Sequence, residues 1–271
     1  MPDTDNRITV TIEAGVADVR LVRTDKMNAL DDAMFSALVE TGERLKSERG
    51  VRAVVLSGEG RAFCAGLDMG NFGRMAEGPR AAPAGGEDFA KRTHGVANRA
   101  QYAVWVWRDI PVPVIAAVHG VAFGGGFQLA LGADMRFVAP DTRMAVLEIK
   151  WGLVPDMAGT MLMRHLARED VVRELTYTGR IFSGEEALTM GFATRVCADP
   201  HAEALAVARE IAGKNPHAIR AAKRLLNAAP VTDQLSGLTQ ETVEQITLIG
   251  SPNQVEAVMA NMQKRAPAFT D

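Results

Sequence analysis

Short apolar stretches alternate with helical patterns along the first 200 residues, and this alternation predicts a sheet covered by helices. Residues 8–12 and 16–21 alternate apolar and polar positions on either side of Glu13-Ala14-Gly15, which is typical of a β-hairpin. The next stretch has a helical period, and Asp31 or Asp32 can cap its first turn. The remaining elements follow from the same rules: strands over 52–57, 113–118, 135–138 and 194–197, and helices over 89–108, 159–167, 170–177 and 183–188.

Two stretches depart from this alternation. Residues 70–88 are rich in Gly, Ala and Pro without a clear period, and we expect a mobile loop there. In residues 201–271 the strand signals cease, and helix-forming residues recur at helical spacing, with breaks at Asn215-Pro216 and Ala229-Pro230. We therefore predict an α/β core over residues 1–200 and a helical region after it.

Three consecutive glycines, Gly124 to Gly126, lie between the strand over 113–118 and a helix that we expect to begin at Gln128. Glycine loses more chain entropy on folding than any other residue, so three together contribute poorly to a core. They do allow two backbones to approach closely, and a strand-to-helix turn leaves N–H groups without partners. Such groups suit an oxygen that carries negative charge, and the pattern therefore predicts an oxyanion site.

A second glycine loop, over residues 56–68, follows the strand at 52–57 and contains Phe63-Cys64-Ala65-Gly66-Leu67-Asp68. With this pair of loops and its later motifs, the chain resembles the crotonase superfamily, the enoyl-CoA hydratase/isomerase family, over nearly its whole length. The later motifs are Leu147-Glu148-Ile149, Gly152-Leu153-Val154-Pro155-Asp156-Met157-Ala158-Gly159-Thr160, Thr178-Gly179-Arg180-Ile181-Phe182-Ser183-Gly184-Glu185-Glu186-Ala187 and Gly191-Phe192-Ala193-Thr194-Arg195-Val196.

The resemblance implies an α/β fold of the ClpP/crotonase type, a spiral of repeated ββα units whose C-terminal helices form a homotrimer or a dimer of trimers. It implies an acyl-CoA thioester as substrate, whose carbonyl oxygen binds the backbone N–H groups of Leu67 and Gly125 while an enolate forms. No metal and no separate cofactor are implied, since the coenzyme A belongs to the substrate. The same matching implies substrate contacts at Lys26, Met27 and Ala29 along the pantetheine and phosphates, at Ala65 and Asp68 near the adenine, and at Gly66 and Gly124.

The reaction depends on the acids and bases around the substrate. Hydratases of this family use two glutamates, and at the first of these positions this chain has Gln128, which cannot act as a general base. The second position keeps Glu148. Asp156 resembles an aspartate of the dienoyl-CoA isomerase branch, where a glutamate and an aspartate move a proton between the ends of a diene. That branch also has an aspartate at the position of Gln128, so this chain matches two of its three acids. We therefore expect Glu148 and Asp156 to isomerise a double bond of an unsaturated acyl-CoA.

Several alternatives to this assignment stay open. One is hydration by Glu148 with Gln128 holding the water, and another is a different enolate reaction, such as dehalogenation, thioester hydrolysis or carbon–carbon cleavage. A third is binding of acyl-CoA without catalysis. For the side chains themselves, Asp156 is also a candidate N-cap of the following helix, and Gln128 a candidate partner for backbone groups in a buried helix.

Composition narrows the partners of the chain. Its 271 residues carry a formal net charge of −3 with a pI near 6.0, which argues against nucleic-acid binding. The two cysteines, Cys64 and Cys197, are too few for a disulfide framework, and Cys64 has no matched base that would make it a nucleophile. The polar first residues are unlike a signal peptide and no apolar run would span a bilayer, so we expect a cytoplasmic protein without a membrane partner.

Two further groups of side chains are expected to have no chemical role. His119 stands beside the first glycine loop, and we expect it to form a hydrogen bond at a strand end. The five histidines of the chain show no metal-ligand spacing. The basic residues Arg220, Lys223 and Arg224 have the spacing of a solvated helix face, and contact with the phosphates of coenzyme A is the alternative.

Overall fold

A six-stranded sheet forms the centre of the computed structural model, which describes residues 7–76 and 87–271. In spatial order its strands are β1 (Ile8–Glu13), β2 (Val16–Leu21), β3 (Ala53–Gly58), β4 (Val114–Val118), β6 (Met135–Val138) and β8 (Arg195–Val196). β1 and β2 pair antiparallel with Glu13 opposite Val16, which confirms the predicted hairpin. The later pairs of this sheet are parallel.

A small second sheet carries the chain from β4 into the first glycine loop. It pairs β5 (Val121–Phe123) with β7 (Arg143–Ala145) in parallel. β5 ends directly before Gly124, where the sequence analysis expects only a turn. The strand forms by pairing with β7 and Cys64. Because these partners come from other parts of the chain, the local sequence does not predict it.

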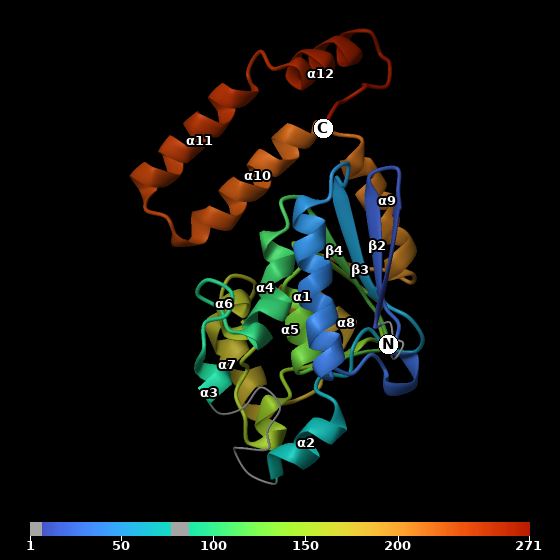
Figure 1. Ribbon diagram of the computed structural model, residues 1–271, viewed down its shortest axis with the longest axis vertical. Coiled ribbons are helices and arrows are strands. Elements are labelled where there is room, and N and C mark those ends of the chain that lie inside the picture. Colours follow the sequence, from blue (N-terminus) through green and yellow to red (C-terminus); the bar gives the residue numbers. More distant parts are fainter. Residues whose placement is uncertain (1–6, 77–86) are drawn as a thin grey trace.

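Helices cover both faces of the main sheet (Figure 1). One face packs against α1 (Asp32–Ser47), α4 (Arg99–Asp109) and α5 (Gly125–Leu131), and the other packs against α9 (Pro200–Ala212). β3 and β4 are therefore buried on both sides, as their continuous apolar sequences predict. The division of the chain at residue 200 stays a prediction, and α9, which follows it, packs on the core sheet.

Helices α1 and α8 begin as their sequences predict. Asp31 caps α1 by accepting a hydrogen bond from the N–H of Met34. Ser183 and Glu186 form a capping box at the start of α8. Other elements before residue 200 are the 3₁₀ turns η1 (Thr24–Lys26) and η2 (Glu148–Trp151) and the helices α6 (Gly159–Met163) and α7 (Glu169–Thr178), and α8 itself spans Gly184–Met190.

The prediction of a loop over residues 70–88 is wrong for the part of that range that the structure describes. Helix α2 (Met69–Ala76) occupies its first part, and α3 (Glu87–Ala90) begins within its last part. The carboxylate of Asp68 accepts a hydrogen bond from the N–H of Gly70 at the start of α2. The predicted mobile segment otherwise falls on residues 77–86, which lie outside the described residues.

The prediction of a single helix over residues 89–108 is also wrong. The chain leaves the helical conformation after α3, and α4 starts afresh at Arg99 behind Asn98. The cause is a capping box: the side chain of Asn98 accepts from the N–H of Gln101, and the side chain of Gln101 accepts from the N–H of Asn98.

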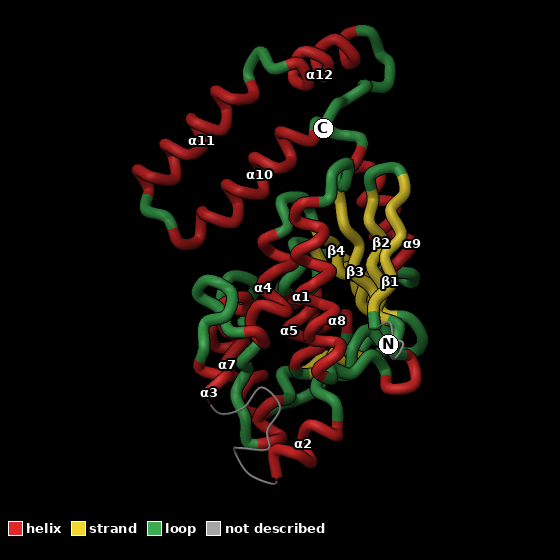
Figure 2. Tube along the Cα trace, in the orientation of Figure 1, coloured by secondary structure: helices red, strands yellow, loops and turns green. Residues whose placement is uncertain are grey.

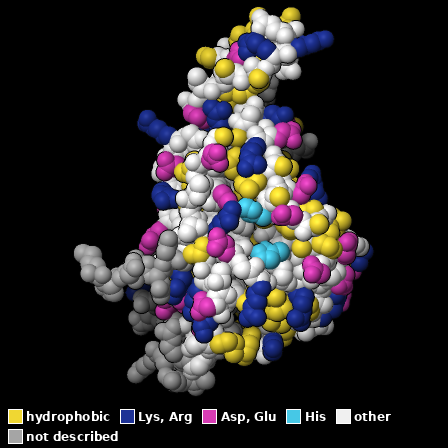
Figure 3. Space-filling view, turned by 90° about the vertical axis from the view of Figure 1, so that its right-hand side faces the viewer, with side chains coloured by type: hydrophobic (Ala, Val, Ile, Leu, Met, Phe, Trp, Pro, Cys, Tyr) yellow, Lys and Arg dark blue, Asp and Glu magenta, His cyan; other side chains and the backbone are white. Residues whose placement is uncertain are grey.

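The last three helices extend away from the sheet (Figures 1 and 2). They are α10 (Pro216–Ala228), α11 (Gln234–Leu248) and α12 (Pro252–Met262), and η3 (Ala229–Val231) lies at the second predicted break. Figure 3 shows apolar side chains on the narrow upper part of the molecule, which these helices form. The exposed apolar residues of α11 and α12 are Leu235, Leu238, Val243, Ile246, Val255, Val258, Met259 and Met262.

Lys223 corrects the prediction of a solvated basic face on α10. Its side chain is buried, and its Nζ donates to the carboxylate of Asp134 at 2.7 Å and to the carbonyl of Val112 at 2.9 Å. Arg224, by contrast, is exposed and pairs with Glu244 of α11. No helix in the described part of the chain has the length and apolar character needed to cross a bilayer.

Candidate active site

The two glycine loops lie side by side. The N–H of Phe63 donates to the carbonyl of His119, the N–H of Cys64 donates to Val121, and the N–H of Phe123 donates back to Cys64, at 3.0, 3.0 and 3.2 Å. The loops therefore pair like short parallel strands, although about 60 residues separate them along the chain. These backbone bonds bring the two loops to one place in the fold.

The close approach of the loops requires glycine. A Cβ on Gly126 would lie 2.2 Å from the carbonyl oxygen of Cys64, and a Cβ on Gly66 would lie 2.5 Å from that of Phe123. The Gly66 Cβ would also come within 3.6 Å of the nitrogen of Gly125, which places the two loops' inner residues next to each other. Gly66 also has a φ of 86°, which disfavours other residues.

The backbone N–H groups of Leu67 and Gly125 differ from those of the adjacent residues Asp68 and Gly124, which donate hydrogen bonds within the protein. The N–H of Asp68 donates to the carbonyl of Leu30, and the N–H of Gly124 donates to that of Ala145. Among the described residues, no acceptor takes a hydrogen bond from the N–H of Leu67 or of Gly125. Both residues line the same cavity, so each is available to a ligand there.

This cavity has a volume of about 720 Å³, which is within the range of small-molecule sites. It collects almost every residue that the sequence analysis assigns to the site: Lys26, Met27, Ala29, Ala65, Gly66, Leu67, Asp68, Gly124, Gly125, Glu148 and Asp156. Gln128 is the exception, because it does not line the cavity. Sequence analysis assigns no site role to the apolar wall, because apolar side chains carry no chemistry that distinguishes them from core residues. The wall is formed by Phe35, Met75, Phe89, Phe123, Trp151 and Met157.

Glu148 is a buried carboxylate, with 8% of its surface exposed. Its Oε1 accepts a hydrogen bond of 2.6 Å from the Nε2 of Gln128, and its Oε2 is buried without a hydrogen-bond partner. Burial raises the pKa of this carboxyl, and the nearby charge of Asp156 raises it further. A Cβ on Gly124 would lie 3.3 Å from the Oε1, so the first glycine loop also makes room for the acid.

Asp156 lies in the same cavity, on the segment between η2 and α6. The residue is exposed, yet the surrounding protein partly desolvates the carboxyl and raises its pKa. The alternative of a helix N-cap is wrong: Ala158 occupies the N-cap of α6 at a φ of 66°, and no side chain caps that helix. Asp156 is therefore free of a structural role at this helix start.

Gln128 is almost completely buried, in α5. Its Oε1 accepts hydrogen bonds from the N–H groups of Met157 and Gly159, both at 2.9 Å, which confirms the interpretation that Gln128 satisfies buried backbone groups. Its Nε2 is directed to Glu148. Water held by Gln128 finds no support in this arrangement, because the side chain does not reach the cavity wall.

Other polar groups near the loops have structural partners. The ring of His119 bonds to the carbonyl of Gly60 at 2.9 Å, as expected. The thiol of Cys64 is buried against the carbonyl of Asn28, and burial raises the pKa of that thiol to about 12. Asp68 forms an ion pair of 2.6 Å with Arg23 at the cavity wall. Among the described residues no three His, Cys, Asp or Glu side chains gather as metal ligands would.

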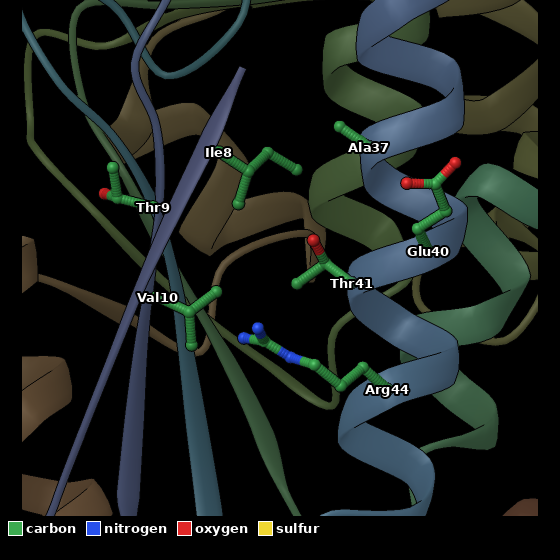
Figure 4. A pocket seen from close by; sticks show the side chains of 7 residues that line it. All are labelled: Ile8, Thr9, Val10, Ala37, Glu40, Thr41 and Arg44. Carbon is green, nitrogen blue, oxygen red and sulfur yellow. The ribbon is translucent and has the colours of Figure 1, made fainter. Parts of the chain in front are cut away.

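A second hollow of about 560 Å³ lies between the edge strand β1 and α1 (Figure 4). Ile8 and Val10 face Ala37 across it, and the side chain of Arg44 extends into the gap. It contains no residue of either glycine loop, and Glu40 and Arg44 are its two charged groups. The convergence of unpaired amides and desolvated carboxylates makes the larger cavity the candidate active site.

Comparison with known proteins identifies the fold and the family of the chain. A solved structure described as a putative enoyl-CoA hydratase from Streptomyces coelicolor superposes with a TM-score of 0.87 at 31% identity, covering 100% of this chain and 96% of that one. The fold is thus the crotonase spiral. The model of the enoyl-CoA hydratase/isomerase family matches residues 11–271, and the chain belongs to that family.

The curated relatives include proteins named as hydratases and proteins named as isomerases. The human enoyl-CoA hydratase domain-containing protein 2 is 31% identical, over 95% of this chain and 86% of its own length. The mouse Delta(3,5)-Delta(2,4)-dienoyl-CoA isomerase is 30% identical, over 92% of this chain and 77% of its own length. At this similarity the chain is an acyl-CoA enzyme of the family, and the comparisons do not separate hydration from isomerisation.

Proposed function

We propose that the protein isomerises a double bond of an unsaturated acyl-CoA. The supporting observation is that Glu148 and Asp156 share one cavity with the free amides of Leu67 and Gly125, while Gln128 is turned away from it. The two amides hold the thioester oxygen as it gains negative charge. A lost donor of this kind typically costs about 3 kcal/mol of transition-state stabilisation.

In this proposal the reaction is a proton transfer along the acyl chain. One carboxylate removes the α proton, the electrons move into the thioester as an enolate, and the other group, protonated, delivers a proton to the far end of the unsaturated system. Water is not consumed, and each carboxyl ends the cycle in the state opposite to its start, so one proton must pass between them or through solvent before the next turnover. Desolvation raises the pKa of both carboxyls, so either is easier to keep protonated than an ordinary surface acid, as the proton-delivering role requires.

The test is to incubate the enzyme with 3-enoyl-CoA and 3,5-dienoyl-CoA in deuterated water and to follow double-bond position and isotope by NMR and mass spectrometry. We expect a shifted double bond, deuterium on carbon, and no added water. Glu148→Gln and Asp156→Asn should each lower kcat at least about 100-fold. Undiminished turnover in both variants would remove the proposal.

Hydration is the second candidate, because solved and curated relatives carry hydratase names. Glu148 would then act alone. A 3-hydroxyacyl-CoA formed from a 2-enoyl-CoA would support this candidate over isomerisation. Tight binding of an acyl-CoA with neither product nor isotope exchange would instead indicate a binding protein.

We also propose a homotrimer or a dimer of trimers, with the exposed apolar side chains of α11 and α12 covered by further copies of the chain. Light scattering after gel filtration should give three or six times the chain mass of 29.1 kDa. A monomer at micromolar concentration would contradict this. The proposed reaction uses proton transfers only, so the coenzyme A arrives with the substrate and no further cofactor is proposed; a cytoplasmic location stays a prediction.

A further inference from the structure

Gln128 joins the two segments that carry the cavity's carboxylates. Its Nε2 donates to the Oε1 of Glu148 at 2.6 Å. Its Oε1 accepts from the N–H groups of Met157 and Gly159, at 2.9 Å each. One amide side chain therefore bonds to the acid at the start of η2 and to the backbone directly after Asp156.

The backbone after Asp156 depends on these bonds. Between the two bonded amides stands Ala158, at a φ of 66°, a conformation that residues with a side chain rarely adopt. Such a residue persists where its surroundings determine it, and here the bonds from Met157 and Gly159 to Gln128 hold it on both sides. The direction in which Asp156 enters the cavity is thus tied to Gln128.

The site is built for a neutral amide. A primary amide offers a donor and an acceptor on one planar group, whereas an ionised carboxylate offers acceptors only. A glutamate at this position would bring a second negative charge against Glu148, at the 2.6 Å now bridged by a hydrogen bond. Gly159 supplies the space, because a Cβ there would lie 2.5 Å from the Oε1 of Gln128.

We propose that Gln128 is a positioning residue that sets the placement of Glu148 relative to Asp156. It occupies the Oε1 of Glu148 and so leaves the Oε2, which has no partner in the protein, as the atom that exchanges protons with substrate. Gln128 itself does not line the cavity. This inference rests on the proposed function for its kinetic consequences, but the tie between Gln128 and Glu148 can be measured without turnover.

Two variants separate the two halves of the amide. Gln128→Met keeps the length of the side chain and removes both donor and acceptor. Gln128→Glu keeps an acceptor for the N–H groups of Met157 and Gly159, and it can donate to Glu148 only while the two carboxylates share a proton. Leu129→Met, a nearly isosteric change at a buried position of the same helix, controls for repacking of α5.

Gln128→Met should lower kcat about 100-fold, since misplacement of a catalytic group by about 1 Å has effects of this size. Its KM should change less than about threefold, because the cavity and the amides of Leu67 and Gly125 remain. Gln128→Glu should retain activity at acidic pH, where the shared proton restores the bond. It should lose activity as pH rises and the pair gives up its shared proton, because the donor to Glu148 is then lost, whereas the neutral amide of Gln128 in the wild type keeps its donor. Leu129→Met should keep the wild-type kcat and pH profile.

A readout without turnover keeps this inference separate from the proposed reaction. In protein labelled with ¹³C at the glutamate carboxyls, the Glu148 signal, assigned with Glu148→Gln, should titrate at a higher pH in Gln128→Met, because the ionised form has lost its donor. An unchanged titration would overturn the inference, as would wild-type kcat and pH profile in both Gln128 variants. An inactive wild-type enzyme whose Glu148 titration shifts as expected would remove the proposed reaction alone.

Discussion

Gly126→Ala tests whether the spacing of the two glycine loops controls catalysis. The new Cβ would lie 2.2 Å from the carbonyl oxygen of Cys64 and 2.8 Å from its carbonyl carbon, whereas real Cβ atoms essentially never come within 3.0 Å of such atoms. Both partners are backbone, so neither can swing aside. The loops must therefore move apart by nearly 1 Å, and the amide of Gly125 must move relative to that of Leu67.

The expected result follows from the size of this displacement. A misplacement of about 1 Å at a reacting group costs about 100-fold in rate, so we expect kcat with an unsaturated acyl-CoA to fall by about that factor. Overpacking costs about 1–3 kcal/mol, which should lower the Tm by about 3–10 °C in a chain of this length. Stopped-flow or steady-state kinetics measures the first effect, and thermal unfolding followed by circular dichroism measures the second.

Gly73→Ala is the matched control. Gly73 lies in α2, and a Cβ there meets nothing within 4 Å, so alanine should keep kcat unchanged and leave the Tm the same or slightly higher. If Gly126→Ala folds with its loops displaced and still turns over at the wild-type rate, then the relative placement of the two amides does not limit the reaction, and the reasoning is refuted.

Two further predictions concern charge and stability. Because burial raises the pKa of the Glu148 and Asp156 carboxyls, their ionised forms destabilise the folded state, and this cost appears as pH rises from the unfolded pKa through the folded pKa. Glu148→Gln and Asp156→Asn should thus raise the Tm at pH 8 more than at pH 4; an equal shift at both would contradict this. Lys223→Met leaves the carboxylate of Asp134 without its cation and should lower the free energy of unfolding by about 3 kcal/mol, measured with urea; a loss below about 1 kcal/mol would show that the pair contributes little.

The sequence predicts most of the sheet and most of the site, and the reasons are local. Glycine clusters after apolar strands mark the loops of Leu67 and Gly125, and continuous apolar runs mark β3 and β4. The capped starts of α1 and α8 are also readable, because a cap depends on residues three positions apart. These features need no knowledge of distant contacts.

What the sequence does not predict depends on contacts between distant residues. The bond from Gln128 to Met157 spans 29 positions, and the pairing of β5 with β7 and Cys64 also joins separate parts of the chain. Lys223 has the spacing of a solvated helix face, yet its partner Asp134 lies 89 positions earlier. In each case the local sequence does not indicate the interaction partner, and only the tertiary structure shows it.

In this cavity the main chain and the side chains are assigned different roles, and this difference affects how substitutions could change the reaction. The groups assigned to the thioester are amides of Leu67 and Gly125, set by loop pairing, while the acids and their amide support come from Gln128, Glu148 and Asp156 on other segments. If the proposed function holds, substitutions at those three side chains would change where protons are transferred and leave the two amides that bind the thioester oxygen in place. In such a fold, substitution of a few side chains could change the reaction while the backbone of the site stays the same.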